Sequence, residues 1–178
     1  NINSWNLIFY RGFIPFLVIL IGLTIIYKSS LFKKILDNGW HGLAFIVTFA
    51  ITSIVFVISI ENTNVANTLV MVALAPMLSA IISLIFLKEN PDQKTWMAII
   101  ITTLAVIYIF YGAIDTGDFL GNFLGLIVAT GLAVNAVVIR SSKKISLVPS
   151  AMFGKLVVAL FSLLFVDQLK LENNDLFI

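Results

Sequence analysis

The chain has 178 residues, of which 60% are hydrophobic and only 11% are charged, and its formal net charge is +2. Soluble domains carry about 25% charged residues, so most of this apolar surface must face lipid or other helices rather than water. The small net charge provides no basic surface for nucleic acid, and the absence of cysteine excludes disulfides and thiolate metal sites.

A helix needs ~20 residues to cross a hydrocarbon core of ~30 Å. Six apolar runs approach this length, and they lack the alternation that marks the strands of a membrane barrel. In chain order, the predicted spanning helices are residues 7–27, 42–60, 65–87, 95–113, 121–139 and 151–166. The predicted fold class is therefore all-α, a polytopic membrane helix bundle with six transmembrane helices in this chain.

Basic and acidic residues are separated between alternate connections of the predicted helices. Every second connection along the chain is basic, and the connections between them are acidic. The basic set is Lys28, Lys33, Lys34, Lys88, Lys94, Arg140, Lys143 and Lys144, whereas the opposite connections hold Glu61, Asp115 and Asp118, and the tail adds Lys170. Because basic residues are retained on the cytoplasmic side of membranes, this bias predicts that the basic connections are cytoplasmic, and it supports the helix count.

Enzyme signatures are missing from the sequence. The one histidine, His41, lies in a loop, and no two carboxylates share a helix at metal-binding or acid–base spacing. We therefore expect no enzymatic activity, no cofactor and no metal. The helices instead carry hydroxyl and amide side chains, which in lipid bond to their own helix or a neighbour more often than to a ligand.

As a set, these side chains suit a bundle with a modestly polar interior. The candidate substrate contacts are Thr52, Asn67, Met71, Pro76 and Asn135, with Arg11 as an electrostatic gate. Pro76 lies in the middle of the third run, where it frees the carbonyl four residues back and bends the helix. Such bends are found both as plain structural features and where transporters bind or gate.

Small and charged residues within the runs carry further expectations. Gly121 and Gly125 form a small-xxx-small pair that favours close packing of the fifth helix. Arg11 lies near the outer end of the first helix and Lys155 near the inner end of the sixth. Both are expected to extend to the nearest headgroups, and the alternative is that one or both attract an anionic or carboxylate-bearing substrate. No Asp or Glu lies inside a predicted helix, so these helices offer no carboxylate for proton or sodium coupling.

Three short motifs lie close together: NVAN at residues 64–67, ALAP at residues 73–76 and LIFLKE at residues 84–89, followed by a helix that opens near Trp96. This stretch resembles the EamA domain of the drug/metabolite transporter superfamily. Phe9-Tyr10-Arg11 is similar to that family's arginine near the start of its second helix. Phe153-Gly154-Lys155 has the same aromatic-x-basic pattern, as expected for a second copy inserted in the opposite direction.

The resemblance implies ten helices in two inverted repeats, of which this chain is a fragment. Residues 1–113 would be the first EamA-like repeat without its first helix, and residues 114–178 the incomplete start of the second. The implied function is transport of small organic metabolites, amino-acid-like or other, including efflux, by alternating access. Residues 42–60 and 65–87 would line the central cavity.

The same resemblance implies a multi-pass protein of the plasma membrane, in bacteria the inner membrane. Its partners would be a small-molecule solute and the lipid bilayer, with no nucleic acid, and a homodimer stays open. Two other classes also stay open. A non-transporting membrane scaffold or assembly subunit predicts a packed interior without a cavity. A lipid-modifying membrane enzyme requires acidic, histidine or metal-ligand clusters at headgroup depth, which these residues do not supply.

Overall fold

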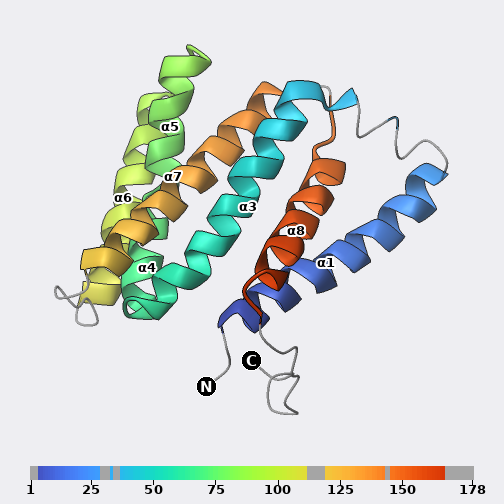
Figure 1. Ribbon diagram of the computed structural model, residues 1–178. Coiled ribbons are helices and arrows are strands. Elements are labelled where there is room, and N and C mark those ends of the chain that lie inside the picture. Colours follow the sequence, from blue (N-terminus) through green and yellow to red (C-terminus); the bar gives the residue numbers. More distant parts are fainter. Residues whose placement is uncertain (1–3, 29–32, 34–36, 112–118, 143–144, 167–178) are drawn as a thin grey trace.

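The computed structural model describes residues 4–28, 33, 37–111, 119–142 and 145–166, and these are helical with short turns and no strand (Figure 1). The helices are α1 (Ser4–Tyr27), α3 (Gly39–Glu61), α4 (Val65–Val72), α5 (Ala75–Phe86), α6 (Gln93–Phe110), α7 (Phe119–Ser141) and α8 (Val148–Leu163). The predicted all-α helix bundle is confirmed.

Each predicted apolar run is helical over most of its length. Four segments are long and apolar enough to cross a membrane, namely α1, α3, α4 with α5 taken together, and α7. The apolar parts of α6 and α8 are shorter. The prediction that His41 lies in a loop is wrong, because α3 begins at Gly39 and His41 is its third residue. Trp96 is the fourth residue of α6.

The third apolar run is divided into two helices next to Pro76. Proline has no backbone N–H and its ring crowds the preceding turn, so a helix cannot run through it undisturbed. Here α4 ends at Val72, and the Leu74 N–H donates to the Met71 carbonyl at 3.0 Å in a tighter turn. Pro76 then lies in the first turn of α5, where its missing N–H costs nothing. The helix is therefore interrupted next to Pro76, with Ala73 and Leu74 still in the right-handed helical conformation.

The basic connections gather at one end of the bundle. The chain leaves α1, α5 and α7 at the same end at which it enters α3, α6 and α8 (Figure 1). We call this the basic end and define it by Lys28, Lys88, Lys94 and Arg140. Glu61 lies at the opposite end, as the last residue of α3. Lys34, Asp115, Asp118, Lys143, Lys144, Lys170 and the predicted repeat boundary at 113/114 fall outside the described residues.

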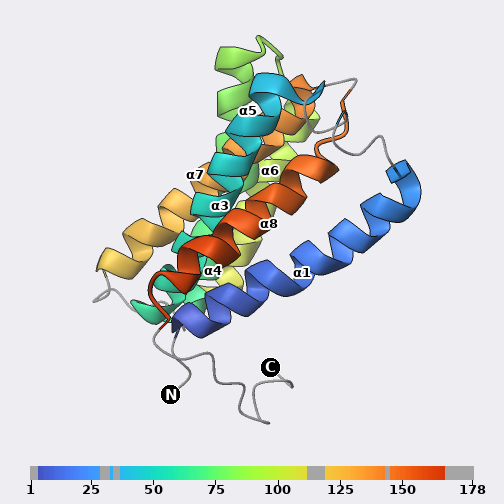
Figure 2. The same cartoon turned by 45° about the vertical axis from the view of Figure 1, so that its right-hand side comes forward.

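Helix α7 packs along α3, α4 and α5, while α8 lies between α1 and α3, with α1 at the edge of the bundle (Figures 1 and 2). Helices of the two predicted repeats therefore pack against each other rather than forming separate blocks. Glycines provide the closest approaches, since without a side chain two helices can touch by their backbones. Gly121 packs against the turn at Asn62 and Thr63, and Gly125 packs against Met71, as the small-residue pattern predicted.

Two hydroxyl groups connect three helices near the opposite end. Ser59 of α3 and Thr68 of α4 are fully buried, and their oxygens lie 2.9 Å apart. The Ser59 hydroxyl also lies 2.9 Å from the Gly121 carbonyl of α7. At the basic end, the Asn38 amide donates to the Ser150 hydroxyl at 2.7 Å and so connects the start of α3 to the start of α8.

Candidate functional site

The larger of the two cavities described below lies at the basic end, between α5, the start of α6 and the end of α7. Its volume is about 650 Å³. One face of α5 forms its floor, because Pro76, Ser79, Ala80 and Ser83 follow the three- and four-residue spacing that places side chains on a single face. The connection 87–92 closes one side, and Leu132, Ala136 and Arg140 of α7 form the opposite wall.

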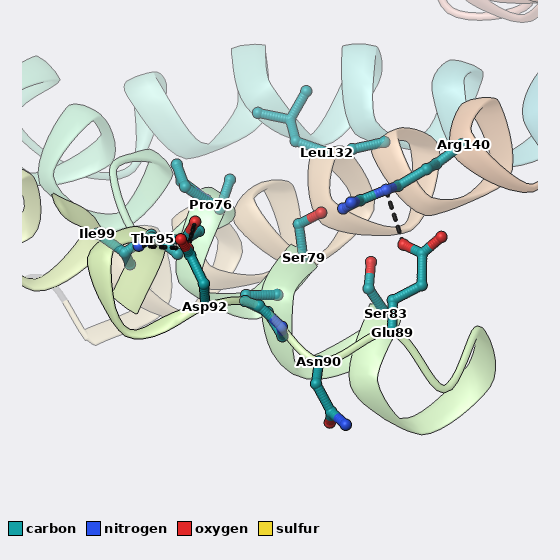
Figure 3. Close-up of a pocket in the computed structure, with 14 residues that line it drawn as sticks. Pro76, Ser79, Ser83, Glu89, Asn90, Asp92, Thr95, Ile99, Leu132 and Arg140 are labelled. Carbon is teal, nitrogen blue, oxygen red and sulfur yellow. Dashed lines mark hydrogen bonds and ion pairs between the residues drawn. The ribbon is translucent and has the colours of Figure 1, made fainter. Parts of the chain in front are cut away.

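The floor of this cavity presents two hydroxyl groups, one turn apart. Ser79 and Ser83 point toward the part of the cavity that holds Arg140 and Glu89 (Figure 3). Ser83 is fully buried, and its hydroxyl has no hydrogen-bond partner among the described residues. A buried polar group without a partner costs roughly 1–3 kcal/mol. The Ser83 oxygen is covered in this conformation, whereas Ser79 is only half-buried and is the more accessible of the two hydroxyl residues.

An ion pair joins two sides of the cavity at the basic end. The Arg140 Nε lies 2.8 Å from a Glu89 carboxylate oxygen (Figure 3). Arg140 is in the last turn of α7, and Glu89 follows Lys88, whose φ of +54° turns the chain sharply after α5. The Arg140 side chain is 60% exposed and the Glu89 side chain 31%, so water and salt weaken the pair.

Asp92 fixes the start of α6 on the same wall. Its carboxylate accepts a hydrogen bond from the Thr95 backbone N–H at 2.9 Å and a short one from the Thr95 hydroxyl. These two bonds hold the pKa of Asp92 below its ordinary value, because they favour the charged carboxylate. Asp92 therefore acts as the N-cap of α6 and contributes a negative charge to the cavity wall.

A second polar contact lies between α3 and α7. The Thr48 hydroxyl is 2.5 Å from Asn135 Oδ1 and 2.8 Å from the Ala44 carbonyl. The Thr48 hydroxyl has one proton, so it is shared between the Ala44 carbonyl and the Asn135 amide oxygen. Asn135 is buried, with 5% of its surface exposed, and its Nδ2 has no hydrogen-bond partner among the described residues.

The structure does not bring the predicted contact residues together in one site. Pro76 lines the larger cavity and Asn135 bonds to Thr48, as described above. Thr52 donates to the Thr48 carbonyl at 2.6 Å and packs against Gly131, while Met71 packs against Gly125. The Asn67 amide donates to the Thr63 hydroxyl at 2.9 Å.

Arg11 is separate from this group, on the far side of α3. Its guanidinium lies 5.2 Å from the centre of the Phe56 ring. Neither of the two cavities is lined by the other predicted contact residues, Thr52, Asn67, Met71, Asn135 and Arg11.

The smaller cavity is mostly apolar and has a volume of about 300 Å³. It lies between α3, α5 and α7, and its lining includes Trp40, His41 and Phe86. Of the two segments that the resemblance placed around the cavity, 65–87 lines both cavities, while 42–60 contributes only Ala44 to the smaller one.

Sequence reasoning did not single out Glu89 and Arg140. They are far apart in the chain, and their charges look like those of any solvated turn, so no local pattern connects them. Ser79 and Ser83 had a usable signal, since two hydroxyl residues at a spacing of four share one helix face. Asp92 and Thr95 also had one, because an Asp shortly before an apolar run is typical of an N-cap.

Comparison with known protein families identifies the family to which the chain belongs. The model of the EamA-like transporter family matches residues 1–111, which is more than half of the sequence. No curated protein and no solved structure gives a match. The chain belongs to the EamA-like transporter family, and with its apolar helices it is a multi-pass membrane protein of a transporter family.

Proposed function

We propose that this chain, as a member of the EamA-like transporter family, is part of a carrier that moves small polar organic solutes across the membrane by alternating access. Membership of the family supports the general part of this proposal, that the protein is a membrane transporter. The observation that carries the finer proposal is the cavity of about 650 Å³ with polar side chains in its lining, among them Ser79, Asp92 and Arg140. A scaffold predicts a packed interior without a cavity, whereas a carrier needs a cavity in which polar groups can bind a solute.

The lining suits solutes that carry both hydrogen-bond donors and acceptors, as amino-acid-like metabolites do. Ser79 and Ser83 offer hydroxyls, Asp92 offers an acceptor, and Arg140 offers donors. Pro76, Leu132 and Ala136 supply apolar surface for the remainder of a solute. A cavity of this size falls in the ordinary range of small-molecule sites, roughly 300–1,000 Å³.

The Glu89–Arg140 pair would act as a gate at the basic end. Glu89 lies in the first predicted repeat and Arg140 in the second, so relative motion of the repeats changes their separation. Thr52, Asn67, Met71 and Asn135 lie at contacts of α3, α4 and α7. They would meet the solute once these helices move apart, with Arg11 acting from the far side of α3.

We further propose that the protein resides in the plasma membrane, in bacteria the inner membrane, with the basic end in the cytoplasm. The gathering of Lys28, Lys88, Lys94 and Arg140 at one end supports this orientation, because cytoplasmic connections of membrane proteins are rich in Lys and Arg. In this orientation the larger cavity lies near the cytoplasmic surface, where it would receive or release a cytoplasmic solute.

The test is flux in proteoliposomes that contain the full-length protein, with a broad panel of labelled small metabolites. Ser79→Phe places a ring in the cavity and should reduce flux at least tenfold. Leu104→Phe, on the exposed face of α6 and outside the cavity lining, is the matched control and should transport as the wild type does. Absence of flux for every solute, or equal flux in Ser79→Phe, would contradict the proposal.

A further inference from the structure

Two cationic side chains of different helices come together away from the larger cavity. Arg11 is on α1 and Lys155 on α8, and the two helices touch next to both residues. A Cβ atom on Gly12 would lie only 2.9 Å from the Lys155 carbonyl oxygen, so α1 and α8 are in backbone contact there.

Both cations rest on one face of α3. The Lys155 Nζ lies 5.0 Å from the centre of the Phe49 ring, and the Arg11 guanidinium lies 5.2 Å from that of Phe56. Ser53 lies between the two rings on the same face, and its hydroxyl oxygen is 3.5 Å from the Lys155 Nζ. That oxygen accepts from the ammonium, which leaves the Ser53 hydroxyl proton available to a further acceptor.

The depth of Lys155 contradicts the expectation that it extends to the headgroups of the basic end. It is the eighth of 16 residues in α8 and contacts Phe49 and Ser53, which lie near the middle of α3. A charge at this depth is costly and marks a functional site more often than not. The two rings compensate only part of this cost, since a cation–π contact contributes ~0.5–2 kcal/mol.

The described residues of the helices around the pair offer no carboxylate to neutralise it. The only acidic residue within the described helices is Glu61, at the end of α3. Two like charges and a free hydroxyl donor on one low-dielectric surface are the arrangement that binds an anion, because charged hydrogen bonds are about twice as strong as neutral ones.

We propose that Arg11, Lys155 and Ser53 form a binding site for an anionic group, a carboxylate or phosphate, at the contact of α1, α3 and α8. The anion lies between the two cations, and the Ser53 hydroxyl donates to it. The site is separate from the cavity at the basic end and shares only Arg11 with the transport proposal, so its binding of an anion is tested apart from solute flux.

The first arm of the test measures binding of inorganic phosphate. The full-length protein is purified in a detergent with a neutral headgroup, and its Tm is followed during a phosphate titration at constant ionic strength. Phosphate should raise the Tm of the wild type, because a ligand that binds the folded state stabilises it. Lys155→Gln and Arg11→Gln should each need at least tenfold more phosphate for the same shift.

Matched variants separate this site from general effects of charge. Lys155→Arg keeps the cation and should respond as the wild type does, while Ser53→Ala should respond more weakly. Lys94→Gln removes a cation at the basic end and should leave the phosphate response unchanged. If Lys155→Gln does not fold, Arg11→Gln and Ser53→Ala carry the comparison.

The second arm asks whether the anion is a lipid headgroup. The same proteins are extracted from phosphatidylcholine vesicles containing phosphatidylglycerol, and native mass spectrometry counts the retained phosphatidylglycerol. Retention by the wild type that is lost in Lys155→Gln and Arg11→Gln assigns the site to a lipid headgroup, and a phosphate response alone assigns it to a free anion. Folded variants that match the wild type in both arms would overturn the proposal.

Discussion

The contact between α1 and α8 depends on the absence of a side chain at Gly12, and Gly12→Ala should weaken it. An added Cβ atom would lie 2.8 Å from the Ala159 backbone nitrogen and 2.9 Å from the Lys155 carbonyl oxygen. Ordinary contacts between heavy atoms are ~3.5–4.0 Å, so α1 would have to retreat by ~0.7 Å along this crossing. Neither backbone atom can rotate away as a side chain could. Small-to-large changes in packed interiors cost ~1–3 kcal/mol, and Gly12→Ala should lower the free energy of unfolding by this amount.

Gly22→Ala is the matched control on the same helix, because nothing lies within 4 Å of the position where its Cβ would be. It should leave stability unchanged or raise it by up to ~1 kcal/mol, since alanine favours helix over glycine. The free energies of unfolding of the two variants, measured in detergent with the full-length protein, should therefore differ by ~1–4 kcal/mol. A Gly12→Ala protein that is as stable as Gly22→Ala would refute the backbone contact.

Three further outcomes follow from the structure. These 178 residues contain no cysteine, so single cysteines introduced at Lys94 and Glu61 can be labelled without background from this part of the protein. Impermeant reagents should reach the two positions from opposite sides of the membrane. Labelling of both from the same side would contradict the topology. The lowered pKa of Asp92 means that its N-cap bonds stabilise α6 above the ordinary carboxyl pKa and are lost as the pH falls through the lowered value. The protection of the amides at the start of α6, meaning their exchange rate relative to an unstructured peptide at the same pH, should therefore fall as the pH drops through this lowered value, and Asp92→Asn should remove this dependence while keeping the cap. Ser59→Ala and Thr68→Ala should each cost ~1 kcal/mol, with a coupling of ~0.6–1.7 kcal/mol in a double-mutant cycle, and zero coupling would mean that the hydroxyls do not bond.

The helices, and the gathering of the basic connections at one end of the bundle, could be predicted from the sequence because both depend on local properties. An apolar run long enough to span lipid must be helical, since lipid offers no partner for backbone groups. The break beside Pro76 is equally local, because proline disturbs any helix that contains it in mid-span. The alternation of basic and acidic connections then assigned each helix end to one side.

The pairing of helices could not be predicted in the same way. In lipid, an apolar side chain gains little by contacting another helix rather than a lipid tail, so hydrophobicity does not encode partners. Nothing in the sequence therefore indicated that Gly12 contacts Lys155, or that Arg140 pairs with Glu89.

The depth of Lys155 was wrongly predicted for a local reason. The sixth helix begins at Val148, with Pro149 in its first turn, and not at residue 151. Three more residues before Lys155 move it by ~4.5 Å from the helix start, at 1.5 Å per residue. That added length takes the ammonium from the headgroup region to Phe49 and Ser53 in the middle of α3.

Two contacts between the predicted repeats differ in a way that bears on motion. The contact of α1 with α8 joins backbone to backbone at Gly12, so separating these helices loses close packing along the crossing. The Glu89–Arg140 contact is a partly exposed ion pair, and such pairs contribute only ~0–1 kcal/mol. If the repeats move relative to each other, the end of α7 should therefore separate from the connection after α5 while α1 and α8 stay together. Spin labels at Lys88 and Arg140 should then report two distances during transport, whereas labels at the exposed positions Val18 of α1 and Val157 of α8 should report one.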